Sequence, residues 1–455
     1  MSRELLIGID VGTTRVKVVI VDLTGAEVAA AAVATPWVVD GQAVEMDARV
    51  LADAVRTVIA DGLAQCSATA GVDGERGGDR VVGLGVTGIA ESGVLLDRRG
   101  EPAAPIIAWH DQRGDVELVA KELPDLVAHT GVRFDPLATI FKLPDILRKS
   151  DGVRWLNVAE WVVHSLGGAQ QAEISLSGRT GLCDLHTATW WPDALEFLGV
   201  DESFLPGDPA FGMSGAGQAS FGPIAGARLV VAGHDHQVAA FVAGAVEPGC
   251  LFESLGTADA IAITVPAPVD VATVLATADI GATIGRTVVA DHLMVMMGMR
   301  TGQILERISR LLDVRDRTAR RALSERAIDR TLDTALTVEL TDGLVTIRGI
   351  GDDTDGAALW AAAVAATGRR TAEVIDQYTA LFGPPTGAVV GGGWLNDPTI
   401  AAAVHRRFPT ARRSRFGEPG AVGAACLAGI SAGVLDGPFA DAETTDGCSG
   451  DRSVP

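Results

Sequence analysis

Near its start the chain reads Leu5-Leu6-Ile7-Gly8-Ile9-Asp10-Val11-Gly12-Thr13-Thr14-Arg15-Val16-Lys17-Val18-Val19-Ile20-Val21-Asp22. The β-branched residues on both sides of Gly12-Thr13-Thr14 predict two strands that are joined by a tight turn. A second turn at Leu23-Thr24-Gly25 lets residues 27–33 return as a third strand. The three strands are therefore predicted to form an antiparallel meander.

A helix and a further strand are predicted after the meander. Apolar residues recur at helical spacing over residues 47–63, and residues 81–86 again have strand character. From about residue 117 to residue 205 the pattern is mostly helical, with interruptions at prolines. Sheet, helix and sheet in this order indicate an α/β layer architecture.

The second half of the chain echoes the first. A β-rich block starts at residue 229, and Phe252–Asp259 again places a glycine-threonine turn, Gly256-Thr257, between two apolar strands. Two helical patterns, a strand and a run of three glycines follow, at residues 301–312, 355–381, 387–390 and 391–393. The shared order of strand, Gly-Thr turn, strand and helices predicts two similar halves.

The composition favours an enzyme that acts on a small molecule. Lys and Arg number 37 against 58 Asp and Glu, which gives a formal net charge of −21. Such a surplus argues against nucleic-acid binding, because phosphate backbones require a basic surface. Hydrophobic residues make up 47% of the chain and charged ones 21%, as in chains that bury a core. A length of 455 residues favours two or three domains.

The same sequence predicts a cytoplasmic location. The first residues lack a charged segment followed by an apolar stretch and a cleavage site, and the apolar runs end before the roughly 18 residues that cross a bilayer. The five cysteines are odd in number and lack metal-type spacing, which argues against a disulfide framework and a zinc cluster. We expect reduced cysteines and no membrane association.

Three glycine-containing turns are candidates for binding phosphate, namely Gly12-Thr13-Thr14, Gly256-Thr257 and Gly391-Gly392-Gly393. A glycine lets the backbone approach a phosphate closely, and a neighbouring hydroxyl adds a donor. Each turn by itself could be an ordinary hairpin. Asp10 is more specific, because a carboxylate inside an apolar strand is costly unless it meets a cation. A water-bridged Mg²⁺ beside the phosphates would supply that partner.

Taken together and in order, these motifs resemble the FGGY carbohydrate kinases of the actin-like ATPase superfamily. The resemblance covers nearly the whole chain and rests on Asp10-x-Gly12-Thr13-Thr14 with Lys17, Gly233-His234-Asp235, Gly256-Thr257, Gly391-Gly392-Gly393-Trp394-x-Asn396, and the segments 108–113, 177–184 and 418–425. It implies an α/β protein with two actin-like (ribonuclease H-like) ATPase domains, residues 1–227 and 228–435, that bind ATP and sugar in the cleft between them. Residues 436–455 are predicted to form a loose tail.

The resemblance also implies roles for single residues. Asp235 matches the general base, which takes the proton of the sugar hydroxyl as it attacks the γ-phosphate; a helix-capping role for Asp235 is compatible with this. Asp10 would hold Mg²⁺ through water. Lys17 would lie on the phosphate hairpin, or it could be a solvent-exposed strand residue. The implied nucleotide-binding residues are Gly12, Thr13, Thr14, Lys17, Gly256, Thr257, Gly392, Gly393 and Asn396.

The sugar site departs from the family at Glu91. Pentulose and gluconate kinases of the family carry a Met-His pair at this place and glycerol kinases carry Arg-Glu, whereas this chain has Ala90 and Glu91. A carboxylate there favours a neutral polyol, a ketose or an amino-bearing sugar and argues against a sugar acid. Glu91 could instead be a surface residue at the end of a strand. The implied substrate-binding residues are Glu91, Ser92, Trp109, Asp111, Arg113 and His236.

Within this set Trp109 can stack on a sugar face and Asp111 can accept hydroxyl protons. Arg113 would either orient Asp111 or meet the substrate. His234 and His236 flank the base, but two histidines without a third ligand make a poor zinc site. One of them would tune Asp235 or touch the substrate.

The sequence therefore predicts an ATP- and Mg²⁺-dependent kinase that phosphorylates a small neutral sugar or polyol. No nucleic-acid partner is expected, and a homodimer is possible. One rival is a catalytically idle sugar sensor on the same scaffold. Another is a different actin-like ATPase such as a chaperone, but the chain shows no long β-rich peptide-binding segment after its second half.

Overall fold

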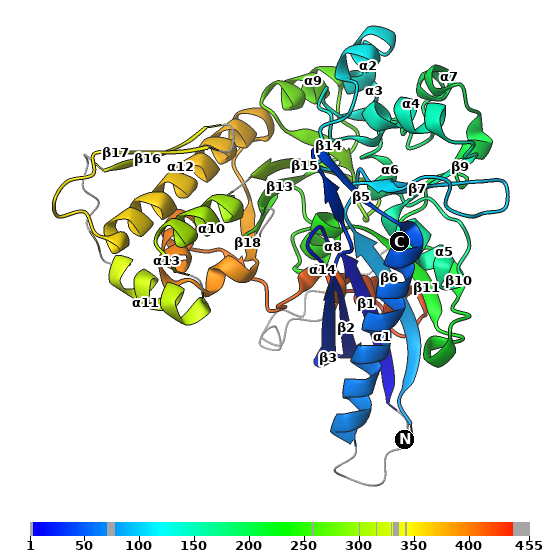
Figure 1. Cartoon of the computed structure of the whole chain (residues 1–455), viewed down its shortest axis with the longest axis horizontal. Helices are drawn as coiled ribbons and strands as arrows, with labels where there is room; N and C mark the ends of the chain where they lie inside the picture. The colour runs from blue at the N-terminus through cyan, green and yellow to red at the C-terminus, as the bar shows by residue number, and fades with distance from the viewer. Residues whose placement is uncertain are drawn as a thin grey trace, which may run out of the picture.

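The computed structural model describes residues 3–70, 78–256, 259–299, 301–314, 316–328, 330, 336–341 and 344–439 (Figure 1). Two six-stranded sheets form the framework. The first has the order β10-β11-β6-β1-β2-β3, built from β1 (Glu4–Val11), β2 (Arg15–Asp22), β3 (Glu27–Ala34), β6 (Arg80–Gly88), β10 (Gly215–Gln218) and β11 (Arg228–His234). The second has the order β14-β15-β13-β12-β18-β19, built from β12 (Cys250–Ser254), β13 (Asp259–Pro266), β14 (Thr283–Arg286), β15 (His292–Met299), β18 (Gly387–Gly391) and β19 (Arg412–Arg413).

Five strands of each sheet share one arrangement, while the sixth strands, β10 and β14, lie at opposite edges. In the first, β1, β2 and β3 form an antiparallel meander, and β6 and β11 run parallel to β1 on its other side. In the second, β12, β13 and β15 form the meander, and β18 and β19 run parallel to β12. The predicted repeat and the predicted opening meander are both confirmed.

Helices cover both faces of the first sheet because its strands are apolar on both faces. Leu5, Leu6, Ile7 and Ile9 of β1 are all fully buried. On one face lie α1 (Ala48–Ala70), which confirms the predicted helix, and α5 (Val158–Ser165). On the other face lie α8 (Asp235–Val242) and α14 (Pro419–Ser431).

The helix α14 lies unusually close to the first sheet because glycines face it. A Cβ added at Gly8 would lie 1.7 Å from the carbonyl oxygen of Ala421, and one at Gly85 would lie 2.0 Å from that of Ala424. At these two positions the backbone of α14 occupies the space that a side chain of the strand would otherwise fill. Residues after position 227 also belong to this layer, because β11 is a strand of the first sheet and α14 packs on it. The domain boundary at residue 227 stays a prediction.

The remaining elements of the first half form a helical layer above the sheet in Figure 1 and two small sheets. Short helices are the main regular elements between residues 117 and 205, but they cover only about half of this segment, so the mostly helical pattern predicted there is confirmed only in part. These elements are α2 (Val116–Glu122), α3 (Leu126–Thr130), α4 (Thr139–Lys149), α6 (Ile174–Ser177), α7 (Pro192–Leu198), η1 (Glu202–Phe204), η2 (Gly222–Ile224), β4 (Val38–Asp40), β5 (Ala43–Met46), β7 (Gly93–Leu96), β8 (Ile106–Ile107) and β9 (Arg154–Asn157).

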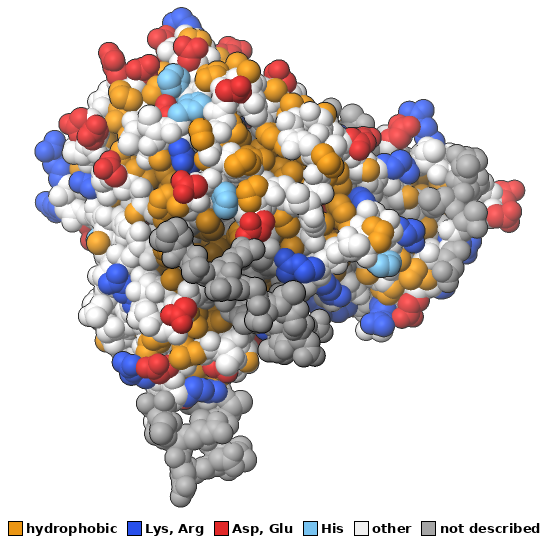
Figure 2. Space-filling view, turned by 180° about the vertical axis from the view of Figure 1, so that it is seen from behind, with side chains coloured by type: hydrophobic (Ala, Val, Ile, Leu, Met, Phe, Trp, Pro, Cys, Tyr) orange, Lys and Arg blue, Asp and Glu red, His pale blue; other side chains and the backbone are white. Residues whose placement is uncertain are grey.

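Helices α10 and α12 of the second half confirm the two helical patterns predicted there. The remaining elements of this half are α9 (Val271–Asp279), α10 (Thr301–Leu311), α11 (Arg317–Ala327), α12 (Gly356–Phe382), η3 (Gly393–Asn396), α13 (Pro398–Arg407) and the hairpin of β16 (Thr337–Thr341) and β17 (Leu344–Arg348). Among the described residues no helix is long and apolar enough to span a bilayer. On the face in Figure 2 acidic and basic side chains are interspersed.

Residues 440–455, most of the predicted tail, lie outside the described residues. The part that precedes them is packed. Phe439 is buried and its ring lies 6.3 Å from that of Phe416. A Cβ at Gly25 would lie 2.7 Å from the ring of Phe439, so this part of the segment covers the turn between β2 and β3.

Candidate active site

The carboxyl ends of β1, β6 and β11 meet at one edge of the first sheet. Asp10 of β1 lies beside Thr87 of β6, and Thr87 lies beside Gly233 of β11. The Thr87 hydroxyl donates to the Gly233 carbonyl over 2.6 Å. Because parallel strands end at the same edge, this pairing brings Asp10 and the residue after β11, Asp235, into one site.

Asp10 faces a cation across the hairpin. It pairs in register with Lys17 of β2, whose Nζ donates to Glu418 Oε2 over 2.6 Å. Burial, followed by the negative charge of Asp235, raises the pKa of Asp10. Burial lowers the pKa of Lys17, but Asp10 and Glu418 outweigh it and leave that pKa raised. The Lys17 side chain is thus paired and only 29% exposed, so the alternative interpretation of Lys17 as a solvent-exposed strand residue does not hold.

Asp235 is the first residue of α8, and its side chain is 24% exposed. Its Oδ1 accepts a hydrogen bond from the His236 amide (2.6 Å) and lies 3.3 Å from His234 Nε2. Burial raises the pKa of Asp235; the His236 amide opposes this shift and the charge of Glu91 adds to it. A carboxyl group that titrates closer to neutrality than an ordinary aspartate suits a general base.

The two neighbouring histidines are neutral near pH 7. Burial lowers the pKa of His236 to about 4 and that of His234 well below its ordinary value. Within the described part of the chain no group of three His, Cys, Asp or Glu side chains could hold a metal ion by itself. His236 lies beside Asp235, and its ring centroid is 5.6 Å from that of His234.

A hydrated Mg²⁺ fits beside Asp10. Asp10 Oδ1 is buried and has no hydrogen-bond partner among the described residues. A Cβ at Gly420 would lie 3.3 Å from Asp10 Oδ2, so the glycine leaves room beside this carboxylate. Carboxylate oxygens are the hard donors that Mg²⁺ prefers, usually with several retained waters. Asp10 would hold the ion, and Asp235 is the carboxylate whose charge acts most strongly on Asp10.

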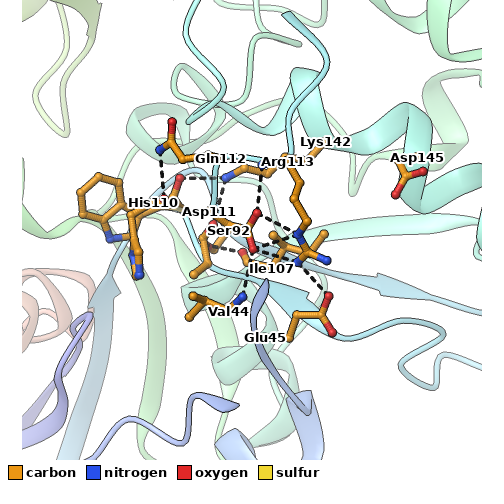
Figure 3. Close-up of polar contacts among 12 residues, drawn as sticks. Val44, Glu45, Ser92, Ile107, His110, Asp111, Gln112, Arg113, Lys142 and Asp145 are labelled. Atoms are coloured by element: carbon orange, nitrogen blue, oxygen red, sulfur yellow. Dashed lines mark hydrogen bonds and ion pairs between the residues drawn. The ribbon is translucent and has the colours of Figure 1, made fainter. Parts of the chain in front are cut away.

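The predicted sugar-binding segment is anchored by an ion pair (Figure 3). The side chain of Asp111 is fully buried and accepts hydrogen bonds from the Val44 amide (3.0 Å) and from Arg113 Nη2 (2.8 Å). Arg113 also pairs with Glu45 Oε1 over 2.8 Å. Burial raises the pKa of Asp111, but Arg113 and the backbone amides more than offset it and leave the pKa below its ordinary value. Arg113 orients Asp111 in this arrangement, and a substrate hydroxyl would have to compete for occupied oxygens.

Ser92 and Lys142 hold the same segment by hydrogen bonds to its backbone carbonyls. The Ser92 hydroxyl is buried and donates to the Ile107 carbonyl over 2.9 Å. Lys142 of α4 is buried and donates to three carbonyl oxygens, those of Ala108 (3.0 Å), Trp109 (2.9 Å) and Leu137 (2.8 Å). Burial lowers the pKa of Lys142 to about 8. Lys142 could not be predicted as a buried residue, because a lysine inside a helix pattern normally faces solvent.

Glu91 is buried rather than exposed at a strand end. It follows β6 with a φ of 59°, a left-handed conformation that non-glycine residues seldom adopt, and this conformation positions its side chain. Arg179 reaches Glu91 Oε1 with Nε (2.7 Å) and Nη2 (2.5 Å). Its Nη1 donates to the Thr283 hydroxyl of β14 in the second sheet. Arg179 thus connects the predicted sugar site to the second half of the chain. Its only signal in the sequence was its place in the family-like segment 177–184.

Replacing Arg179 by Met should lower the free energy of unfolding by roughly 3 kcal/mol, because it leaves the buried carboxylate of Glu91 without its cation. Arg148→Met, which breaks an ion pair with Asp145 at an arginine that is 74% exposed, is the matched control and should cost less than about 1 kcal/mol. Urea denaturation measures both. Equal losses in the two variants would contradict the assignment of a buried pair.

The second and third predicted turns pack against each other. The Leu255 amide donates to the Gly391 carbonyl (2.8 Å), and the Trp394 amide donates to the Leu255 carbonyl (3.2 Å). Gly392 has a φ of 106°, and a Cβ there would lie 2.3 Å from the Leu255 carbonyl oxygen. No other residue fits at Gly392, and Leu255, which precedes Gly256, is in direct contact with the glycine run.

The remaining residues predicted to bind the nucleotide lie on these turns or on the first hairpin. Gly393 and Asn396 are exposed, and the side-chain oxygen of Asn396 accepts a hydrogen bond from Arg413 over 2.9 Å. Thr257 lies outside the described residues. Thr14 is exposed at the tip of the first hairpin, and the Gly12 amide closes the hairpin by donating to the Arg15 carbonyl over 3.0 Å.

Comparison with known proteins supplies the family. Residues 5–242, more than half of the chain, match the FGGY family of carbohydrate kinases, N-terminal domain. Glycerol kinase of Geobacter sp. (strain M21) is 30% identical over 196 residues, 39% of this chain and 39% of that protein. L-Fuculokinase of Escherichia coli (strain K12) is 26% identical over 263 residues, 54% of this chain and 53% of that protein. The chain thus spans about half or less of the length of these curated relatives.

Solved structures confirm the fold. The ligand-bound xylulose kinase from Lactobacillus acidophilus has a TM-score of 0.80 and 18% identity, over 95% of this chain and 90% of that one. Plasmodium falciparum glycerol kinase with ADP has a TM-score of 0.80 and 16% identity, over 96% of this chain and 91% of that one. The predicted fold class, two actin-like ATPase domains, is confirmed by these likenesses. With the match over residues 5–242, they establish that this protein belongs to the FGGY family of carbohydrate kinases.

Proposed function

We propose that this protein transfers the γ-phosphate of ATP to a hydroxyl group of a small neutral sugar or polyol, with Asp235 as the general base. The observation that carries this proposal is the cluster at the edge of the first sheet. There Asp235, whose pKa is raised by burial, lies within electrostatic reach of Asp10, Lys17 and Glu91. Phosphoryl transfer demands mainly positioning and neutralisation of charge, and this cluster offers both.

The reaction assigns one task to each group. The substrate oxygen forms a bond to the γ-phosphorus, the bond from that phosphorus to the ADP oxygen breaks, and the hydroxyl proton passes to a carboxylate oxygen of Asp235. The backbone amide of His236 donates a hydrogen bond to Asp235 Oδ1 and keeps this carboxylate oriented. Bound Mg²⁺ would neutralise phosphate charge beside Asp10. Thr13 and the backbone amides of its hairpin would bind phosphate oxygens.

A neutral substrate follows from the charges around Glu91. The guanidinium of Arg179 is used by the Glu91 carboxylate, and the ammonium of Lys142 is used by three carbonyls. Neither cation is left for a carboxylate on a sugar acid. Both hydrogen bonds from Arg179 to Glu91 end at Oε1. Oε2 is therefore the oxygen that would accept a hydrogen bond from a substrate hydroxyl.

Within this class we propose a ketose such as a xylulose-like pentulose, or an alditol. The names of the relatives, glycerol kinase and L-fuculokinase, motivate both choices. The proposal includes a cytoplasmic location and a homodimer. Its rival is a sugar sensor without turnover, which would need neither a base at Asp235 nor a carboxylate at Asp10.

Steady-state ADP release tests the proposed activity. The protein is incubated with ATP and a panel of ketoses, alditols and glycerol, with and without MgCl₂. At least one compound should stimulate ADP release, and chelation of Mg²⁺ should abolish that stimulation. A panel that stimulates nothing, or turnover that persists without any divalent ion, would contradict the scheme.

The pH profile should carry the signature of Asp235. The base acts as a carboxylate, and because its pKa is raised above the ordinary 3.8, kcat/KM should fall tenfold per pH unit on an acidic limb displaced toward neutrality. Glu91→Gln should move this limb to lower pH, because the Glu91 charge raises the pKa of Asp235. A limb that stays in place in Glu91→Gln would show that another group titrates.

A further inference from the structure

Thr13, at the centre of the phosphate hairpin, is held by two tryptophans from different segments. Trp109 of the sugar-binding segment donates from Nε1 to the Thr13 hydroxyl oxygen over 2.8 Å. Trp37, which follows β3, donates from Nε1 to the Thr13 carbonyl over 2.7 Å. The sugar-binding segment and the phosphate hairpin are therefore joined by a direct hydrogen bond.

The direction of these bonds determines what the hairpin offers to a ligand. An indole N–H can only donate, so the Thr13 hydroxyl accepts from Trp109 and keeps its own proton for another acceptor. Thr35 adds two bonds, from its hydroxyl to the Gly12 carbonyl (2.7 Å) and from its amide to the Thr14 carbonyl (3.1 Å). All three carbonyls of the turn are thus occupied by donors from one side. What remains is a donor surface suited to an anion.

The tryptophan that makes this contact is itself fixed. Lys142 holds the carbonyls of Ala108 and Trp109, and two residues further Asp111 is anchored by Arg113 and the Val44 amide. The Trp109 ring also lies 5.3 Å from the His110 ring in an edge-on arrangement. A shift of the sugar-binding segment would consequently move the Trp109 indole and change its hydrogen bond to the Thr13 hydroxyl.

We propose that Trp109 is a positioning residue for phosphate binding: its indole N–H orients the Thr13 hydroxyl, so that occupation of the sugar site and the placement of the ATP phosphates are coupled through this one bond. The inference rests on the proposed function, since it needs a nucleotide at the hairpin. It gives Trp109 a second role, besides stacking on a sugar face, that can be separated by substitution.

The test is a double-mutant cycle on nucleotide affinity. Trp109→Phe keeps an aromatic ring and removes the donor, and Thr13→Val keeps the shape and removes the acceptor. Isothermal titration of the whole protein with Mg-AMP-PNP should show a loss of affinity of about tenfold for each variant, as expected for one hydrogen bond beside a charged ligand. The double variant should lose no more than either single variant. Affinity for adenosine, which has no phosphate, should stay within about twofold of that of the unaltered protein.

Trp190→Phe is the matched control. Its Nε1 donates to the Gly207 carbonyl over 2.7 Å in the helical layer, away from the hairpin, so the same substitution should leave the affinity for Mg-AMP-PNP unchanged. If Trp109→Phe fails to fold, Thr13→Val still tests the same hydrogen bond, because it removes the acceptor instead of the donor. Unaltered protein that binds no Mg-AMP-PNP would refute the nucleotide-binding function itself. Tight binding by the unaltered protein together with full affinity in Trp109→Phe, or additive losses in the double variant, would overturn the positioning role alone.

Discussion

Asp235→Asn should lower kcat by about 10³-fold while Mg-AMP-PNP still binds. The asparagine can keep the hydrogen bond that Oδ1 accepts from the His236 amide, so the start of α8 should stay in place. What it loses is the carboxylate that receives the substrate proton. Because burial penalises the charge of Asp235, its removal should not destabilise the protein.

Two measurements check this expectation. Turnover on the best compound of the sugar panel is compared among the unaltered protein, Asp235→Asn and the control Asp145→Asn, which changes a carboxylate that forms surface ion pairs. Titration with Mg-AMP-PNP establishes that the site is intact. Residual activity of Asp235→Asn above one tenth of the original would remove Asp235 from its role as base, as would an equal loss in Asp145→Asn.

Gly8→Ala should produce the largest loss of stability. The added methyl group would lie 1.7 Å from the Ala421 carbonyl oxygen and 2.9 Å from the Ala425 amide, both of them backbone atoms of α14. Neither can move without lifting the helix from the first sheet. We expect unfolding free energy to fall by at least about 3 kcal/mol, or soluble expression to be lost.

Gly298→Ala provides the control within a strand of the second sheet. A Cβ there meets no heavy atom within 4 Å, and Gly298 is exposed on β15. Its effect should stay within about 0.5 kcal/mol. Thermal unfolding and urea denaturation of the two variants distinguish a specific clash from a general cost of replacing strand glycines. Near-equal stability would mean that α14 does not lie on β1 as described.

Local patterns sufficed to predict the framework. The hairpin of β1 and β2 could be read from β-branched residues around a Gly-Thr turn, and the repeat from the order of turns and strands. The contact of Gly8 with α14 could not be read, because Ala421 lies more than 400 residues away and small residues have no periodic signature of their own. The buried position of Phe439 was missed for the same reason. The residues around Phe439 are mostly polar, and its apolar contacts are with residues far away in the sequence.

The candidate site was predictable in its residues but not in its pairings. Asp10 lies near the end of its strand, and Glu91 and Asp235 follow strands that end at the same edge; the resemblance implied that all three belong to one site. The partner of Glu91, Arg179, and the partner of Thr13, Trp109, depend on segments far apart in sequence. Such pairings are set by the tertiary structure alone.

These pairings change how the net charge of −21 must be understood. Lys17 lies on the hairpin and Arg113 in the predicted sugar-binding segment, but Lys17 pairs with Glu418, and Arg113 pairs with Asp111 and Glu45. Neither of these two side chains is therefore free to bind a polyphosphate. We expect backbone amides, the Thr13 hydroxyl and a bound Mg²⁺ to neutralise the phosphates, so activity should depend steeply on Mg²⁺.

Phosphorus-31 NMR of the complete reaction tests the central claim most directly. Protein, MgATP and each compound of the sugar panel are incubated together, and the spectra are compared with mixtures that lack the sugar, the Mg²⁺ or the protein. The account predicts a new phosphomonoester resonance, growing in step with ADP, only when all components are present. A compound that raises the thermal unfolding temperature but yields no phosphomonoester with MgATP would contradict it and identify the protein as a sugar sensor.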